Sequence, residues 1–150
     1  MTTSLEAELY KAAVLTFEEL SFMLPLCGPD QAQSAGQAAA VATVRFSGPL
    51  SGRLVLGASD ELLPAMTANI LGDDNIADAR LQCDALGEVA NVICGNLLPA
   101  IGNVHEVYRI EAPQLQGKTP HVADEGAPSA EVCLVLEEGW ARVGLYLERG

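Results

Sequence analysis

An acidic residue and an amide stand three positions apart in an apolar segment of the sequence, LGEVANVICGNLL. They are Glu88 and Asn91, flanked by Gly87 and Gly95. A carboxylate can pair with a cation, whereas an amide carries both a donor and an acceptor and can hold one water in a fixed orientation. An oriented water is what in-line attack on a phosphoryl group requires of a protein. The spacing suits that chemistry, but it is also typical of the solvated side of an amphipathic helix.

The residues around this pair have helical spacing, and we predict a helix over residues 77–101. Its apolar side recurs at intervals of three and four residues and comprises Leu86, Ala90, Ile93, Leu97 and Ala100, widened by Val89 and Val92. Asp84, Glu88, Asn91 and Gly95 follow the same interval on another side. A glycine inside a helix costs about 1 kcal/mol relative to alanine. Gly87 and Gly95 therefore indicate a close approach to the helix backbone, either by another element of this chain or by a partner.

The remaining elements that would position this helix are readable from periodicity and turn residues. Residues 5–24 predict a helix capped by Ser4, and a second helix should begin at Ser59 or Asp60 and end at GDDN, residues 72–75. Two hairpins are expected, AAVATVRFSGPLSGRLVLGA and EVCLVLEEGWARVGLYLE, with a further strand in VHEVYRIEAP and an exposed loop over QLQGKTPHVADEGAPSA. This order predicts an α+β fold in one domain, residues 1–150: a mostly antiparallel sheet with a helical layer that includes two long helices.

Composition limits the partners. The chain of 150 residues has 8 basic and 20 acidic side chains, a net charge of −12. Such a charge repels phosphate backbones and anionic lipid over about 8–10 Å at ordinary salt, so we expect neither nucleic acid nor a membrane as partner. No apolar run approaches the roughly 20 residues that span a bilayer, and no signal peptide is recognisable. A cytoplasmic location is expected.

Other chemistries fit the sequence poorly. His105 and His121 lack the spacing of a zinc site, and Ser51 stands in SGPLSG, which is better explained as a hairpin turn than as a phosphate loop. The scattered cysteines are expected to be small buried hydrophobic residues in a reducing compartment: Cys27, Cys83, Cys94 and Cys133. Trp140 is expected to pack beside a tight turn.

The segment DALGEVANVICGNLL resembles the signature of the CheC/CheX/FliY family of chemotaxis phosphatases: Asp84, three residues, Glu88, two residues, Asn91. The preceding GPLSGRLVLGASDELLPAMTANILG is similar to the hairpin and helix before that signature, and the resemblance covers roughly residues 40–150. Family members of the CheC type carry a second copy in the first helix. FEELSFML, where neither Glu18 nor Glu19 is followed by asparagine three residues later, lacks it. The chain therefore resembles the single-site CheX-like branch.

The resemblance implies a phosphatase that hydrolyses the aspartyl phosphate of a CheY-like receiver domain. Glu88 would pair with the receiver's active-site lysine, and Asn91 would enter the receiver pocket and orient the attacking water. Gly87 and Gly95 would leave room for docking, with Asp84 in a supporting role. No cofactor of its own is implied, because the Mg²⁺ belongs to the receiver.

Two further expectations follow. A non-catalytic module that binds a receiver or flagellar protein through the same helix is the alternative to an enzyme. CheX-like proteins form dimers through their sheets, and the C-terminal strand GLYLE is expected at an exposed edge of a monomer, which natural proteins usually cover. A homodimer is therefore predicted.

Overall fold

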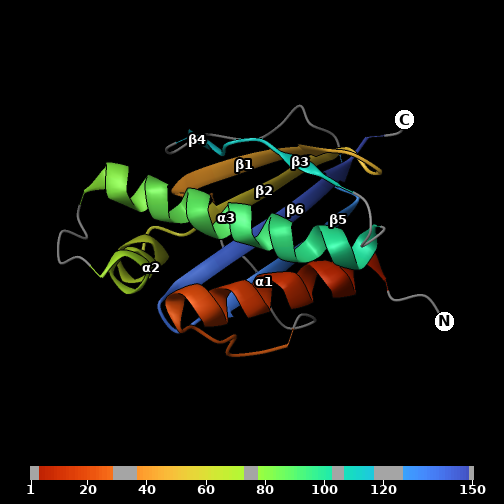
Figure 1. Ribbon diagram of the computed structural model, residues 1–150. Coiled ribbons are helices and arrows are strands. Elements are labelled where there is room, and N and C mark those ends of the chain that lie inside the picture. The colour runs from red at the N-terminus through yellow and green to blue at the C-terminus, as the bar shows by residue number, and fades with distance from the viewer. Residues whose placement is uncertain (1–3, 29–36, 73–77, 103–106, 117–126, 149–150) are drawn as a thin grey trace.

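The computed structural model describes residues 4–28, 37–72, 78–102, 107–116 and 127–148. Within these ranges, three helices lie against one face of a sheet of six antiparallel strands (Figure 1). The two longer helices lie side by side across the sheet, and the third lies near one end of them. The predicted α+β class, with a mostly antiparallel sheet and a helical layer, is confirmed.

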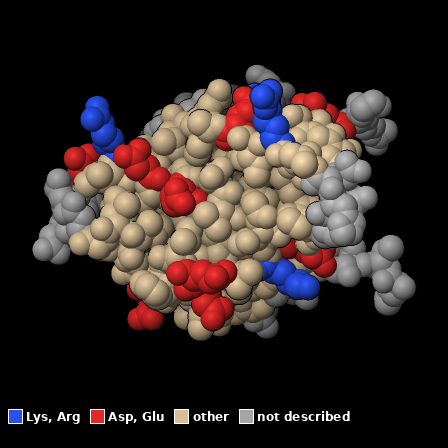
Figure 2. Space-filling view, in the orientation of Figure 1, with Lys and Arg blue, Asp and Glu red and all other residues tan. Residues whose placement is uncertain are grey.

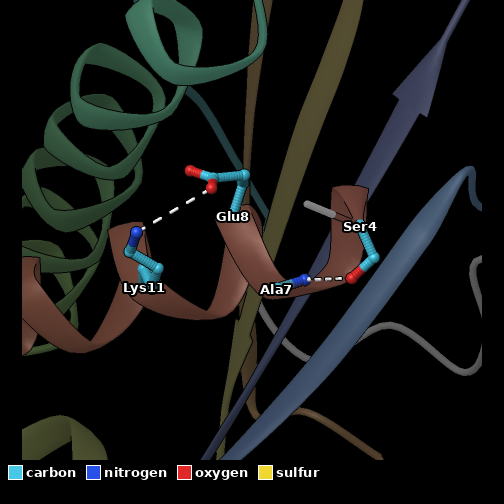
Figure 3. Close-up of polar contacts among 4 residues, drawn as sticks. All are labelled: Ser4, Ala7, Glu8 and Lys11. Carbon is cyan, nitrogen blue, oxygen red and sulfur yellow. Dashed lines mark hydrogen bonds and ion pairs between the residues drawn. The ribbon is translucent and has the colours of Figure 1, made fainter. Parts of the chain in front are cut away.

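The first helix, α1 (Leu5–Ser21), begins where the sequence predicts. The Ser4 hydroxyl accepts a hydrogen bond from the Ala7 N–H at 3.0 Å (Figure 3). The helix ends three residues earlier than expected, because Phe22 adopts a left-handed conformation with φ of 61° and its N–H closes the last turn on Glu18. Leu24, predicted within the helix, therefore lies beyond it and is exposed.

Both predicted hairpins are present. The first joins β1 (Ala40–Ser47) to β2 (Gly52–Ala58), and the second joins β5 (Ala130–Leu136) to β6 (Gly139–Leu147). Side chains alternate between the two faces of each strand, so that every second residue of β2 and β5 is buried. The helices cover this buried face, where the apolar side chains form a single core cluster.

The strand order corrects one expectation. The sheet runs β3-β1-β2-β6-β5, so β6 is hydrogen-bonded on both sides and lies inside the sheet. The prediction of an exposed edge at the C-terminal strand is therefore wrong. Pairing between β2 and β6 joins segments far apart in the sequence, and local alternation carries no signal for it.

The outer edge of β1 holds two short strands, β3 (Arg109–Ile110) and β4 (Gln114–Gln116). The first confirms the strand expected in VHEVYRIEAP, although it is only two residues long. The second lies at the start of the segment predicted as an exposed loop, and that part of the prediction is wrong. Residues 117–126 of the loop, like His105 and His121, lie outside the described residues.

The helix α2 (Leu62–Leu71) ends at Gly72 in a left-handed conformation, as its glycine predicts. Its beginning differs from expectation. Neither Ser59 nor Asp60 is the cap: Glu61 occupies that position without a side-chain hydrogen bond. The Ser59 hydroxyl instead accepts the Trp140 N–H at 3.0 Å and ties the helix entry to the start of β6.

Candidate functional site

The helix α3 (Ala79–Ile101) carries the residues singled out by sequence. Asp78 caps it, because its carboxylate accepts the N–H groups of Arg80 and Leu81 at 2.8 and 3.4 Å. The helix continues through Pro99 to Ile101. Of the predicted apolar set, Leu86, Val89, Ala90, Ile93 and Leu97 are buried. The prediction is wrong for Ala100, which is exposed in the last turn, and for Val92, which is only half-buried.

The opposite side of α3 faces solvent. Asp84 and Glu88 are exposed and Asn91 is half-buried, one above the other along the helix. Within the part of the chain that the structure describes, the side chains of Glu88 and Asn91 make no hydrogen bond or ion pair. A carboxylate and an amide are thus presented together, with their polar atoms available to a second molecule.

The two glycines occupy different surroundings. A Cβ placed on Gly87 would lie 3.3 Å from the Leu115 side chain and 3.4 Å from Pro113, so Gly87 lets the β4 segment approach α3. A Cβ on Gly95 would meet nothing within 4 Å. The close approach indicated at Gly87 is therefore made by another element of this chain, the first of the two alternatives that the sequence left open. Gly95 is exposed and leaves its part of the surface open.

A polar contact that sequence reasoning missed joins α3 to α1. The Asn96 amide donates to the Thr16 hydroxyl at 3.0 Å, and Thr16, fully buried, donates in turn to the Ala12 carbonyl at 2.7 Å. Thr16 interrupts the apolar side of its helix, and that interruption was the available signal. The contact fixes the two long helices beside each other next to the candidate site.

Charge is unevenly distributed on the helical face. Figure 2 shows a broad surface free of charged atoms across the middle of this face, with acidic and basic groups above and below it. Exposed carboxylates on the two long helices contribute to the acidic character, among them Asp84, Glu88, Glu18 and Glu19. A basic group on a partner would be attracted to this face.

Other sites are not supported in the described part of the chain. It contains no group of three or more His, Cys, Asp or Glu residues placed to hold a metal ion. Its helices include none that is both long and apolar enough to cross a membrane. None of the four cysteines is in a disulfide. Cys94 is buried as expected, but the expected burial is wrong for Cys27, Cys83 and Cys133, which are half-buried. Burial raises the pKa of the Cys94 thiol to about 12, which makes it a poor nucleophile.

The sequence was compared with models of known protein families and with curated protein sequences. Residues 40–137 match the family described as "Chemotaxis phosphatase CheX". No curated protein sequence matches the chain.

Solved structures share the fold. The chemotaxis protein CheX from Desulfovibrio desulfuricans is 20% identical, with a TM-score of 0.73 over 96% of this chain and 99% of that one. CheX from Vibrio vulnificus is 12% identical, with a TM-score of 0.77 over 97% of each chain. A CheX-CheY-BeF3-Mg²⁺ complex from Borrelia burgdorferi matches at 13% identity, with a TM-score of 0.73 over 99% of this chain and 100% of that one.

Proposed function

Because the chain belongs to the chemotaxis phosphatase CheX family, we propose that it hydrolyses the aspartyl phosphate of a CheY-like response-regulator receiver domain. The proposal rests above all on Glu88 and Asn91, which lie together on the solvent side of α3 with no partner among the described residues. Complex formation with CheY by the structurally similar Borrelia protein supports the choice of partner.

In the proposed reaction, a water attacks phosphorus as the bond to the aspartyl oxygen breaks, which releases phosphate and the free carboxylate. Asn91 orients that water through its amide. Its half-buried position already restricts side-chain rotation, so less conformational entropy is lost when the amide holds the water. Glu88 pairs with the receiver's active-site lysine and fixes the register of docking. The Mg²⁺ is held by the receiver.

The two roles predict different losses. Asn91→Ala should leave receiver binding nearly intact and remove most of the acceleration, because only water positioning is lost. Glu88→Ala should also weaken binding, by about 1.5–3 kcal/mol, the range for a charge-assisted hydrogen bond. The measurements are single-turnover loss of phosphate from a phosphorylated receiver with Mg²⁺, receiver affinity and thermal unfolding.

Asp84→Asn is the matched control, since it removes an exposed carboxylate one turn from Glu88 and should have the smaller effect. An Asn91→Ala protein as fast as the parent would refute the role of Asn91. A loss of several kcal/mol in folding free energy for either variant would mean that the side chain serves packing. The alternative function, a non-catalytic receiver-binding module, predicts binding by the parent without faster phosphate loss.

We also infer a homodimer in the cytoplasm. The dimer is supported by the family resemblance and by the sheet edges at β5 and at β3 and β4, which further strands can extend. The location is supported by four cysteines without a disulfide, as is usual in a reducing compartment.

A further inference from the structure

A groove follows the outer side of α1 and reaches the last turns of α3. Leu15 lies in it and is 45% exposed, although the same helix buries Leu9 completely. The groove's other lining residues include Glu8, Lys11, Glu18, Asn96 and Ala100. Val14 and Ala100 also line the groove, so it offers an apolar centre with charged groups at its border, the arrangement found in protein–protein interfaces.

The groove and the candidate site lie on different flanks of the same helix, α3. Asn96, which lines the groove, lies five residues beyond Asn91, an axial rise of about 7.5 Å, and is turned about 140° around the helix from it. The direction of Glu88 lies between the two, about 80° from Asn96. Gly95 stands between them with open space above it. Figure 2 shows the uncharged middle of this same helical face. A globular molecule that covers the solvent side of α3 around Glu88 and extends toward the end of the helix would therefore contact both Asn91 on one flank and the groove on the other.

The charges at the groove indicate what kind of surface it fits. Glu8 and Glu18 border it, and Lys11, the basic residue among its described lining residues, lies 3.8 Å from the Glu8 carboxylate (Figure 3). A second copy of this chain, with its net charge of −12, would bring like charges together here. An apolar surface bordered by Lys or Arg is the better complement.

We propose that this groove is a second contact region for the phosphorylated receiver, taking an apolar receiver surface bordered by basic side chains beside the phosphorylation site. The proposal rests on the proposed function. Leu15 would then determine affinity without touching the reacting atoms, and Glu8 and Glu18 would speed association.

The test uses the full chain with a purified CheY-type receiver, phosphorylated for turnover and in its beryllofluoride–Mg²⁺ form for binding. Leu15→Lys should raise the half-saturating receiver concentration and the dissociation constant about tenfold or more, while the saturated rate changes by less than about twofold. Leu71→Lys is the matched control, because Leu71 is 42% exposed at the end of α2 and outside the groove. It should behave as the parent.

The Glu8→Gln, Glu18→Gln double variant should associate more slowly and lose part of the salt dependence of association. Parent-like affinity of Leu15→Lys for the receiver would overturn the groove proposal. A change in the oligomeric mass of Leu15→Lys relative to the parent would also overturn it, because the groove would then be a contact between two copies of this chain. A parent that binds the beryllofluoride receiver without hydrolysis would refute only the catalytic function. A parent that neither binds the beryllofluoride receiver nor hydrolyses the phosphorylated one would refute both the proposed function and the groove proposal.

Discussion

Gly87 and Gly95 are the same residue type in one helix, but their surroundings give opposite expectations for adding a methyl group. Gly95→Ala should stabilise the protein by about 0.5–1 kcal/mol, because alanine favours the helix and its Cβ enters open space. Gly87→Ala should gain clearly less or lose stability, since its Cβ crowds Leu115 and Pro113 at 3.3 and 3.4 Å. Denaturant unfolding of both variants measures the difference.

The same two substitutions distinguish an effect on folding from an effect on receiver docking. If a receiver approaches the helix at Gly95, Gly95→Ala should weaken receiver binding while it stabilises the fold. Gly87 packs against the protein's own strand, so its substitution should affect binding only through stability. Equal stabilisation by both alanines would contradict the packing described at Gly87.

The polar residues of this site were predictable because they depend on one helix. The spacing of Asp84, Glu88 and Asn91 defines a side of α3 from sequence alone, and their exposure agrees with it. The role of Gly87 was not predictable. It depends on Pro113 and Leu115, which reach the helix only through the pairing of β4 with β1.

Among the elements, α1 and α3 must keep a fixed position relative to each other if one partner is to contact both the candidate site and the groove. The Asn96–Thr16 hydrogen bond contributes to this relation. Asn96→Ala should cost about 0.5–1.5 kcal/mol, the usual net value of one hydrogen bond, because Thr16 keeps its bond to the Ala12 carbonyl.

A double-mutant cycle checks that assignment. Thr16→Val preserves side-chain shape and removes the hydroxyl, so adding Asn96→Ala to it should cost much less than Asn96→Ala alone. Additive losses in unfolding free energy would mean that the two residues act independently. Asn69→Ala, which removes a hydrogen bond to the Ser21 carbonyl, is a control that should remain additive with Thr16→Val.

Element boundaries were predictable where a local residue sets them. Ser4, Gly72 and Ile101 mark ends that capping or the limit of apolar periodicity identified. The beginning of α2 was not, because the hydroxyl of Ser59 bonds to Trp140 in a strand far along the chain. Long-range hydrogen bonds compete with local capping, and sequence spacing does not report them.

At the scale of the whole molecule, the α+β fold class could be predicted from the sequence, but the strand order could not. Alternation predicted both hairpins, but either hairpin could have supplied the edge of the sheet. The structure places β6 beside β2, which leaves β5 at one edge and the short β3 and β4 at the other. The homodimer prediction therefore no longer depends on an open C-terminal strand.

Self-association and receiver binding should respond to salt in opposite directions. Each chain has a mass of 15.7 kDa and a net charge of −12, so two copies repel each other, and screening of that repulsion should strengthen the homodimer. Receiver binding through acidic groups should weaken under the same change. Sedimentation at micromolar protein should give about twice the chain mass, with dissociation on dilution first seen at low salt. A mass near one chain at every salt concentration would refute the homodimer, and a dimer weakened by salt would mean that ion pairs between the copies outweigh their overall repulsion.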